Sequence, residues 1–354
     1  MKLSRNNHYI PRMYLNNWCT DKGDIYTYRL LVSDERVPEW NRRPVSRTGS
    51  ETNLYLRVQD GIQTDDFEHD LDRRFESPAK EALEKAISSG KLTPDDWHKL
   101  TDFVCSLYVR TPSFYLYSKD MGMKIVPEVL EDVCKELETI TADNIPELRH
   151  STGTEPDLMP ISLTEMPEKP DDEHTMVEIN TVVGKSMWLL FMRHSLEDNS
   201  VLRNYFGSLK WSIVTAHKDV RWPTTDTPVA IVQEASNNRY SLVKDGIEGK
   251  NVFLLIPISP EKALLASKTR RFDFRFTATE AFSLNIKRLI INNALMYIYF
   301  DSEDEQVPAF RRRLVNYEEY KRLEKEFTEW FDNYIKHEGP MLDKSSRKIK
   351  RINN

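Results

Sequence analysis

The chain has 354 residues, which is long for one ordinary domain and short for three, so we expect one large or two modest globular units. Its 39% hydrophobic content, 30% charged content and net charge of −6 are typical of a soluble globular protein and exclude a fibrous one. No apolar run, residues 187–192 included, approaches the roughly 18 residues of a membrane helix, so no membrane span is predicted. Three widely spaced cysteines, with no apolar stretch of signal-peptide length after Met1, predict a cytoplasmic protein with reduced thiols.

The first half of the chain predicts short strands followed by helices. Period-two alternation indicates strands, and apolar residues that recur every four positions indicate helices with one buried face. Thr93-Pro94-Asp95-Asp96 has the cap, proline and acidic residues typical of a helix start. The predicted elements are strands at Ile25–Val32 and Asn53–Val58, and helices from Phe67 to Ile87, from Pro94 to a break at Pro112, at Pro127–Thr139 and at Met176–Leu196.

A charged excursion interrupts this pattern. Residues 141–173 hold nine acidic and two basic residues, together with five prolines, which deny the segment helix and sheet hydrogen bonds. We therefore expect a mobile surface segment there. The chain ends on a basic tail, residues 342–354, with five basic residues and one acidic one, which we interpret as a solvated end.

From Leu209 onward the apolar period changes to two, which predicts a β-rich second half. The predicted elements are strands at Trp211–Ala216, Pro228–Gln233, Asn251–Ile258, Ala263–Ser267 and Leu295–Phe300, and helices at Thr279–Asn293 and Tyr317–His337. The fold class is therefore α+β, with a mixed or antiparallel sheet from N-terminal and C-terminal strands packed with a central helical region. We divide the chain into residues 1–140, 141–173, 174–341 and 342–354, within one integrated domain.

The chain opens on His8-Tyr9-Ile10-Pro11-Arg12-Met13-Tyr14-Leu15, followed by a strand from Gly23 to Tyr28. This opening resembles the start of a bacterial family known only as domain of unknown function 4238, whose members begin with a His-x-x-Pro-x-x-Tyr-Leu pattern and a strand. Later pieces follow in the family's order, namely Glu51 with Tyr55, Glu76, Arg110-Thr111-Pro112, Trp211, Thr225-Asp226-Thr227-Pro228, Ile256–Pro260 and Leu284-Asn285. The acidic excursion and Thr225, where the family more often has Ser, depart from the pattern. The resemblance marks positions without assigning them an activity.

Among these positions, His8 and Asp226 are the main candidates for catalysis. The ordinary pKa of a histidine makes both of its forms accessible at neutral pH, so His8 suits acid–base work or metal ligation. The alternative for His8 is a backbone contact that pins the N-terminus. Asp226 follows a predicted strand, where it can deliver a carboxylate into a cleft or bond the amides of its own turn.

Each of the remaining candidates has both a structural and a functional interpretation. Arg110 ends a helix, where a guanidinium can satisfy carbonyls or clamp a phosphate. Glu51 and Glu76 are candidate carboxylates or solvated surface residues, and Asn285 can cap a turn or position a ligand. Two arginine clusters beside aromatic residues suit a nucleic-acid groove, and they comprise Arg42, Arg43 and Arg47 near Trp40, and Arg270, Arg271 and Arg275 near Phe272, Phe274 and Phe276.

Two hypotheses of function remain, because the sequence holds no P-loop, dinucleotide-binding, serine-elbow or Cys-x-x-Cys motif. The first is a phosphodiester hydrolase that acts on nucleic acid, with His8 and Asp226 around a divalent metal or as an acid–base pair, and with phosphate held by arginines. The second is a non-catalytic binding or regulatory module that engages a protein partner. Convergence of His8 and Asp226 with Glu51, Glu76 or Arg110 in one cleft would favour the hydrolase.

Overall fold

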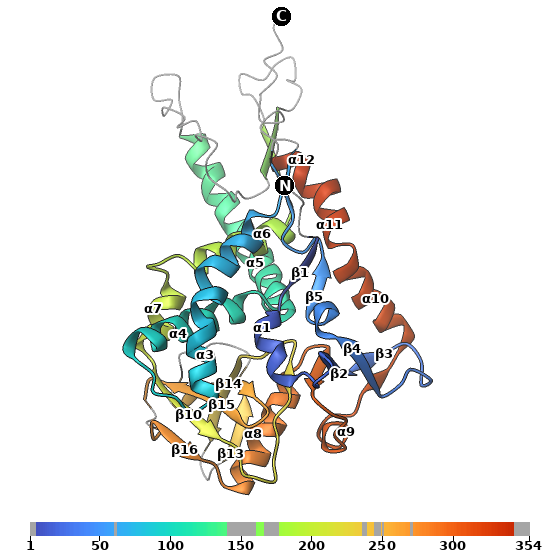
Figure 1. Ribbon diagram of the computed structural model, residues 1–354. Helices are drawn as coiled ribbons and strands as arrows, with labels where there is room; N and C mark the ends of the chain where they lie inside the picture. Colours follow the sequence, from blue (N-terminus) through green and yellow to red (C-terminus); the bar gives the residue numbers. More distant parts are fainter. Residues whose placement is uncertain are drawn as a thin grey trace, which may run out of the picture.

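The structure is a computed structural model that describes residues 5–59, 62–139, 161–165, 177–235, 239–243, 249, 251–269 and 272–342. These residues form an α+β fold with helices packed against mixed and antiparallel sheets, as the sequence predicts (Figure 1). The basic tail, Arg270, Arg271 and most of the acidic excursion lie outside the described residues, so the predictions made for them stay predictions.

The largest sheet has the strand order β13-β12-β14-β15-β10-β16, and its pairs are antiparallel except for β10 with β16. Its strands are β10 (Lys210–Thr215), β12 (Ala230–Ala235), β13 (Arg239–Leu242), β14 (Val252–Ser259), β15 (Lys262–Ser267) and β16 (Arg275–Thr277). All of β14 is buried, because Leu254 and Ile256 pack in the cluster that contains the helices of the first half, while Phe253 and Leu255 pack with Ile286 on the other face.

A second sheet joins the start of the chain to its end. Its order is β11-β17-β2-β4, all antiparallel, and Tyr297 lies opposite Arg29 in the β17–β2 pair. This pairing confirms the predicted sheet of N-terminal and C-terminal strands. The strands are β2 (Asp24–Arg29), β4 (Trp40–Pro44), β11 (Thr224–Thr225) and β17 (Tyr297–Phe300). Further two-stranded pairs are β1 (Asn6–His8) with β5 (Ser50–Thr52), β3 (Leu31–Val32) with β18 (Leu314–Val315), β6 (Arg57–Gln59) with β7 (Ile62–Thr64), and β8 (Ile161–Glu165) with β9 (Val177–Thr181).

Several helices begin at a capping side chain, namely Thr93, Ser200, Thr279 and Asn316. Thr93 and Asp96 form a reciprocal capping box at the start of α4, as the sequence predicts. The α-helices are α1 (Arg12–Leu15), α2 (Asp66–Leu71), α3 (Ser77–Ile87), α4 (Pro94–Val109), α5 (Pro112–Glu138), α6 (Lys185–Ser195), α7 (Val201–Ser208), α8 (Glu280–Asn293), α9 (Gln306–Phe310), α10 (Tyr317–Thr328), α11 (Trp330–Asn333) and α12 (Gly339–Leu342). Shorter turns are η1 (Asn16–Trp18) and η2 (Val45–Arg47), both 3₁₀, and η3 (Asp72–Glu76) and η4 (Tyr334–Glu338), both π-helical.

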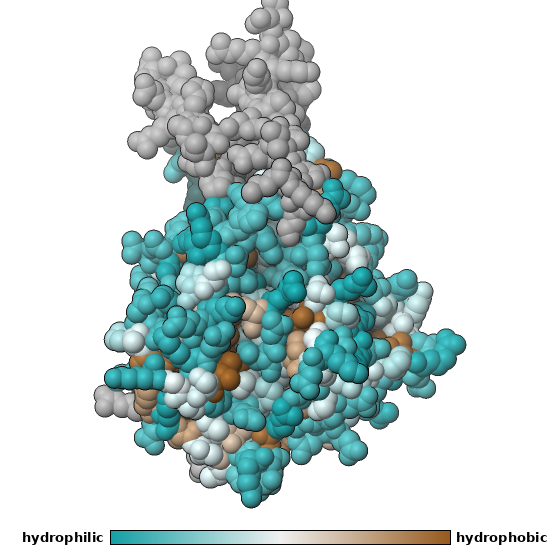
Figure 2. Space-filling model, in the orientation of Figure 1, coloured by the Kyte–Doolittle hydropathy of each residue, from teal (hydrophilic) through white to brown (hydrophobic). Residues whose placement is uncertain are grey.

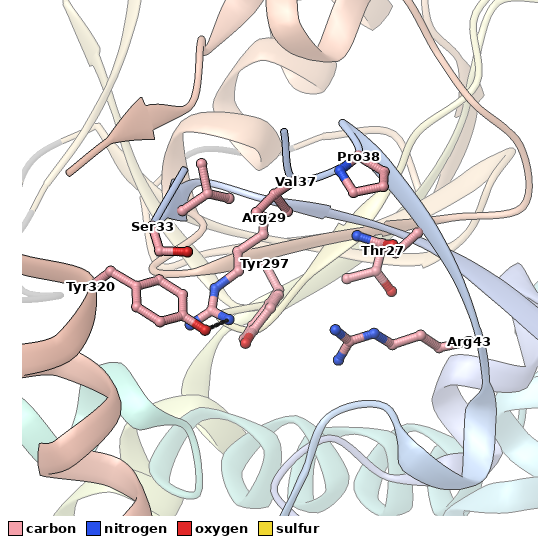
Figure 3. Close-up of a pocket in the computed structure, with 10 residues that line it drawn as sticks. Thr27, Arg29, Ser33, Val37, Pro38, Arg43, Tyr297 and Tyr320 are labelled. Carbon is pink, nitrogen blue, oxygen red and sulfur yellow. Dashed lines mark hydrogen bonds between the residues drawn. The ribbon is translucent and has the colours of Figure 1, made fainter. Parts of the chain in front are cut away.

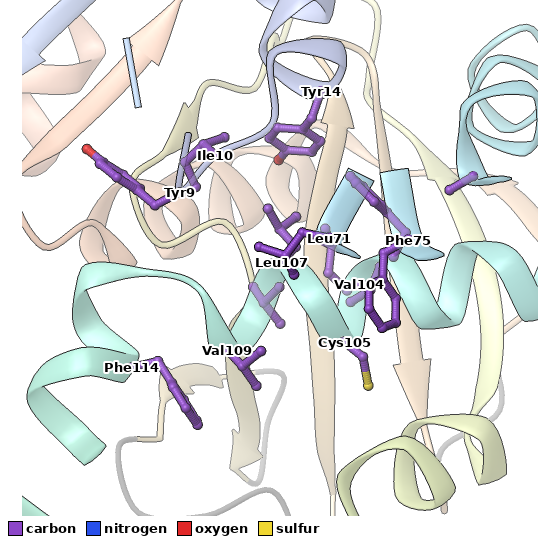
Figure 4. Packing of buried hydrophobic residues seen from close by; sticks show 14 of the residues in the cluster. Tyr9, Ile10, Tyr14, Leu71, Phe75, Val104, Cys105, Leu107, Val109 and Phe114 are labelled. Atoms are coloured by element: carbon purple, nitrogen blue, oxygen red, sulfur yellow. The ribbon is translucent and has the colours of Figure 1, made fainter. Parts of the chain in front are cut away.

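The N-terminal segment is buried in the main core. Figure 4 shows Tyr9, Ile10 and Tyr14 beside residues of the first helices, such as Phe75 and Val104. Tyr14 also accepts or donates a hydrogen bond at 2.7 Å to Thr224 Oγ1 and donates one at 2.6 Å to the carbonyl of Pro257. The segment that carries the family-like opening is therefore held between the helices and both large sheets.

Three predicted elements are wrong in their bounds. The segment predicted as a strand at Asn53–Val58 contains a turn, because Asn53 adopts a φ of 58° between β5 and β6. The helix predicted at Met176–Leu196 begins only at Lys185, since β9 occupies the alternating residues Val177–Thr181. Helix α5 starts at Pro112 and continues through Pro127, so the helix predicted at Pro127–Thr139 is the second half of a longer one.

Part of the acidic excursion also differs from the prediction. Residues Ile161–Glu165 form strand β8, which pairs with β9, although prolines flank this segment in the sequence. Elsewhere, in the face shown in Figure 2, hydrophilic side chains surround scattered hydrophobic ones. Among the described residues, we find no helix with the length and apolar character needed to cross a bilayer.

Candidate functional site

Arg110 is the centre of a buried polar cluster. It follows α4, and 1% of its surface is exposed. Its guanidinium donates to the carbonyls of His8 (2.9 Å) and Tyr9 (3.1 Å) and to Oε1 of Glu76 (2.7 Å), at the end of the π-helical turn η3. Glu68 faces the same guanidinium, and burial raises the pKa of its carboxyl to about 7. The structure thus brings His8, Glu76 and Arg110 together, and Arg110 ties the N-terminal segment to the helices.

His8 is neutral at physiological pH in this environment. Burial, with the positive charges of Arg110 and Arg12, lowers the pKa of its imidazole to about 4. The ring faces the backbone of Val45 and Ser46, and its Nε2 has no hydrogen-bond partner among the described residues. His8 therefore suits a fixed structural role more than proton exchange near pH 7.

Asp226 is fully buried and bonds to three consecutive backbone amides. Its Oδ1 accepts from the N–H of Leu295 at 2.9 Å, and its Oδ2 accepts from those of Met296 at 2.6 Å and Tyr297 at 3.2 Å. Burial raises the pKa of this carboxyl to about 7, against the effect of the three amides. Among the described residues Asp226 and His8 share no hydrogen-bond partner, and no hydrogen bond joins the Asp226 carboxylate to the His8 imidazole.

The polar face of the β11-β17-β2-β4 sheet forms a hollow of about 260 Å³ (Figure 3). Strand register explains its composition, because side chains two residues apart on a strand share a face. Thr27 and Arg29 come from β2, Arg43 from β4, Tyr297 from β17 and Tyr320 from α10. The hollow therefore combines two guanidinium groups with two phenol rings.

Arg29 is fixed in the wall of this hollow. Its guanidinium carbon lies 5.3 Å from the centre of the Tyr297 ring and 4.3 Å from that of Tyr320. Its Nη1 donates to Tyr320 Oη at 3.1 Å and lies 3.5 Å from the carboxylate of Glu324. Arg29 is thus an oriented positive charge with part of its field balanced by Glu324.

Arg43 and Thr27 are the unsatisfied groups of the hollow. Arg43 points into it in Figure 3 and has no ion-pair or hydrogen-bond partner among the described residues, whereas the adjacent Arg42 pairs with Asp24 at 3.0 Å. Thr27 is 4% exposed, and its hydroxyl also lacks a described partner. A buried hydroxyl and an unpaired guanidinium in one cavity are typical of a site for an oxyanion.

Glu51 adds a carboxyl to this region. It lines a narrower hollow of about 60 Å³ together with Tyr9 and Tyr299, and the two hollows share Thr27 and Arg43. Burial raises the pKa of Glu51 to about 7, although the positive charge of Arg29 opposes the rise. The hydroxyls of Tyr9 and Tyr299 lie 3.4 Å apart in the same wall. A pKa near 7 leaves both the neutral and the ionised form of Glu51 accessible at neutral pH, beside a cationic pocket.

The other predicted residues lie elsewhere. Asn285 donates to the carbonyl of Ala281 at 3.1 Å, one turn earlier in α8, and it lines neither hollow. Arg270 and Arg271 are outside the described residues, while Arg275 of the same cluster donates to the carbonyl of Gly90 at 2.6 Å. In the described part of the chain no three His, Cys, Asp or Glu side chains are grouped so that they could hold a metal ion.

Sequence reasoning missed Arg29, Thr27, Tyr297 and Tyr320 as site residues. Thr27 and Arg29 lie on the polar face of a predicted strand, where such side chains are usually solvated. Tyr297 and Tyr320 belong to an apolar predicted strand and to the inward face of a predicted helix, where aromatic side chains usually pack in the core. The sequence indicates Arg43 only as one member of the cluster with Arg42 and Arg47, and not as a separate site residue. The signal that could have found them is the alternation Thr27–Arg29 beside Tyr297–Tyr299, but it becomes meaningful only once β2 is known to pair with β17.

Comparisons with known proteins agree with the resemblance in the sequence. No curated protein and no solved structure matches the chain. A family model described as "Protein of unknown function (DUF4238)" matches residues 6–304, which include every described residue of both hollows except Tyr320. On that match the chain belongs to the DUF4238 family.

Proposed function

We propose that this protein is a hydrolase of phosphate diesters, with nucleic acid as its substrate class, and that its active site is the pair of hollows around Arg43 and Glu51. The observation that carries the proposal is the combination in one cavity wall of an unpaired arginine, a buried unpaired hydroxyl and a carboxyl whose pKa burial raises to about 7. Phosphoryl oxygens need donors and positive charge, and hydrolysis needs a base that is partly ionised at the working pH.

In this proposal each of these side chains has one role in the hydrolysis. Arg43 and Thr27 bind the non-bridging oxygens of the phosphate, and Arg29 adds a fixed positive charge as negative charge develops in the transition state. Glu51, in its ionised form, takes a proton from the attacking water. A new bond forms between the water oxygen and phosphorus, the ester P–O bond breaks, and the leaving oxygen takes a proton from solvent.

His8, Glu76 and Arg110 act as positioning residues in this proposal. Arg110 holds the carbonyl of Tyr9, and the Tyr9 ring lines the narrower hollow, so the buried cluster sets the position of that wall. Asp226 has the same relation to Tyr297, whose amide it accepts and whose ring lines both hollows. These residues and Asp226 thus hold the walls of the site in position. Glu51 is the sequence-predicted residue that, in this proposal, acts on the attacking water.

The proposal is tested by assay of the purified protein on bis(p-nitrophenyl) phosphate, single-stranded DNA and RNA, each with magnesium and with chelator. We expect turnover that Glu51→Gln lowers by about a hundredfold or more, as for loss of a general base. Arg43→Ala should raise KM by about tenfold, as for loss of one charged contact. Arg42→Ala is the matched control, since Arg42 is adjacent but pairs with Asp24. Absence of turnover on all three substrates, or turnover unaffected by Glu51→Gln, would overturn the proposal.

The second candidate is a non-catalytic module that binds a phosphorylated or otherwise anionic partner in the same hollows. It is favoured by the contacts of Asp226 and Arg110, which bond to backbone groups of distant segments in the manner expected of structural ties. It predicts binding of pyrophosphate that Arg43→Ala weakens, without turnover of any diester. We also propose, for either function, that the protein resides in the cytoplasm. This compartment agrees with the three unpaired cysteines.

A further inference from the structure

A second cavity, separate from the polar hollows, lies between the helices and the large sheet. Its volume is about 800 Å³, within the range of cavities that hold small-molecule ligands. Its walls come from α5, α6 and α7 and from β12 with the segment that ends β13, and they are mainly aromatic and aliphatic. Representative lining residues are Phe114, Met121, Phe191, Leu202, Ile231 and Leu242.

Hydrogen-bond donors without partners line the same cavity. Ser118 is fully buried, and neither its hydroxyl nor that of Thr227 has a partner among the described residues. Arg311 lines it too. Its Nη1 donates to the carbonyls of Ile291, Asn292 and Ala294, while no described residue bonds its other nitrogens. A buried hydroxyl without a partner is costly, so these groups point to a ligand with hydrogen-bond acceptors.

The cavity opens along α5. Tyr117 and Ile125 line it and are 53% and 38% exposed, and Val129 and Val133 continue the same row at four-residue spacing with 44% and 38% exposure. Four-residue spacing places these side chains on one face of the helix. An apolar path therefore leads from the cavity along α5, the long helix that runs away from the large sheet in Figure 1.

We propose that this cavity binds an aliphatic carboxylate, with its chain against the apolar wall and its head group at Thr227 and Arg311. The donors favour a carboxylate over an alcohol, because Arg311 adds a positive charge to the hydroxyl groups. The same charge repels an ammonium head and so lowers its affinity. The site is independent of the proposed phosphodiesterase, because its lining residues are different from those of the polar hollows.

The test is calorimetric titration of the full chain with dodecanoate, dodecanol and dodecylammonium, each below its micellar concentration. We expect dodecanoate to bind at least about tenfold more tightly than dodecylammonium. Thr227→Val should weaken dodecanoate by several-fold while leaving dodecanol nearly unchanged, because it removes a hydroxyl and keeps the shape. Equal affinity for all three amphiphiles, or no binding of dodecanoate, would overturn the proposal.

A matched pair of variants locates the binding. Leu202→Trp fills the cavity and should lower the affinity for dodecanoate by about tenfold or more. Val201→Trp changes the neighbouring residue of α7, which is 84% exposed and outside the cavity, and should leave the affinity unchanged. Met121→Trp fills the cavity from α5 and replaces Leu202→Trp if that variant does not fold. Equal binding by the filled and control variants would show that dodecanoate binds elsewhere.

Discussion

Asn7 and Glu51 lie opposite each other in the β1–β5 pair, so Glu51 and His8 belong to opposite faces of that short ribbon. The contacts agree with this register. His8 faces Val45, Ser46 and the charge of Arg110, whereas Glu51 lines the hollow of Tyr9 and Tyr299. Two candidates that are close in space are therefore separated by the ribbon, and only Glu51 belongs to the polar hollows.

Glu51 should make the protein less stable as the pH rises. Its pKa in the folded chain is about 7, above the ordinary value of 4.5, so between these values the folded chain holds a proton that the unfolded chain has released. The free energy of unfolding should therefore fall through pH 4.5 to 7 and become level above it. Glu51→Gln removes this loss, and we expect it to be more stable than the wild type at pH 8 by on the order of 1 kcal/mol. Urea denaturation of both proteins at pH 5 and pH 8 measures this difference in the free energy of unfolding. A Glu51→Gln protein that is less stable than the wild type at pH 8 would contradict the prediction.

His8 should have the opposite effect in an overlapping range. Its pKa is about 4 in the folded chain and 6.5 ordinarily, so below pH 6.5 the unfolded chain binds a proton that folded His8 does not. The free energy of unfolding should fall as the pH drops from 6.5 to 4. Because Glu51 acts in the other direction, the difference between the wild type and His8→Gln is the quantity to measure. It should grow by on the order of 1 kcal/mol in favour of His8→Gln between pH 7 and pH 4.5. A difference that does not change with pH would show that His8 is not buried as described.

Asp226→Asn should cost stability without affecting His8. Both carboxylate oxygens of Asp226 accept amide hydrogens, and an asparagine places an NH₂ group against at least one of these donors. We expect a loss of about 1 to 3 kcal/mol at pH 8, measured by urea denaturation. The His8 resonance should titrate as in the wild type by NMR. A shift in the His8 pKa would revive the shared site that the sequence suggested.

Arg110→Met should be among the most destabilising single changes. It leaves the carbonyls of His8 and Tyr9 and the carboxylate of Glu76 without their donor in a buried cluster. We expect a loss of roughly 3 to 5 kcal/mol, as for breaking a buried ion pair. Glu76→Gln keeps an accepting oxygen and should cost about 1 kcal/mol. Arg73→Ala is a control, since Arg73 pairs with Asp70 on the exposed surface of η3; a comparable loss there would deny Arg110 a special role.

Much of the fold could be predicted from local patterns, because caps and periodicity are local. The capping box of Thr93 and the run at Asn251–Ile258 are examples, the latter matching β14 within one residue at each end. The Met176–Leu196 helix failed because the apolar run after Lys185 outweighed the alternation Val177, Ile179, Thr181. The prediction was wrong where a segment with the period of a strand is followed directly by one with the period of a helix.

The site was harder to predict, because it depends on which strands pair. Thr27 and Arg29 become cavity residues when β17 lies beside β2, a contact between residues about 270 positions apart. Glu51 was identified from the resemblance to the family, but the neighbours that raise its pKa come from distant parts of the chain. The alternative weighed for Asp226, an acceptor for the amides of its own turn, is right in the kind of contact and wrong in its place, because the three amides belong to residues 295–297.

The three amides held by Asp226 belong to a segment that touches both cavities. Leu295 lines the apolar cavity, and Tyr297, two residues later, lines the polar hollows. A carboxylate that accepts from three successive peptide N–H groups fixes the short segment that forms part of the wall of each cavity, so the loss of Asp226 should disturb both walls at once.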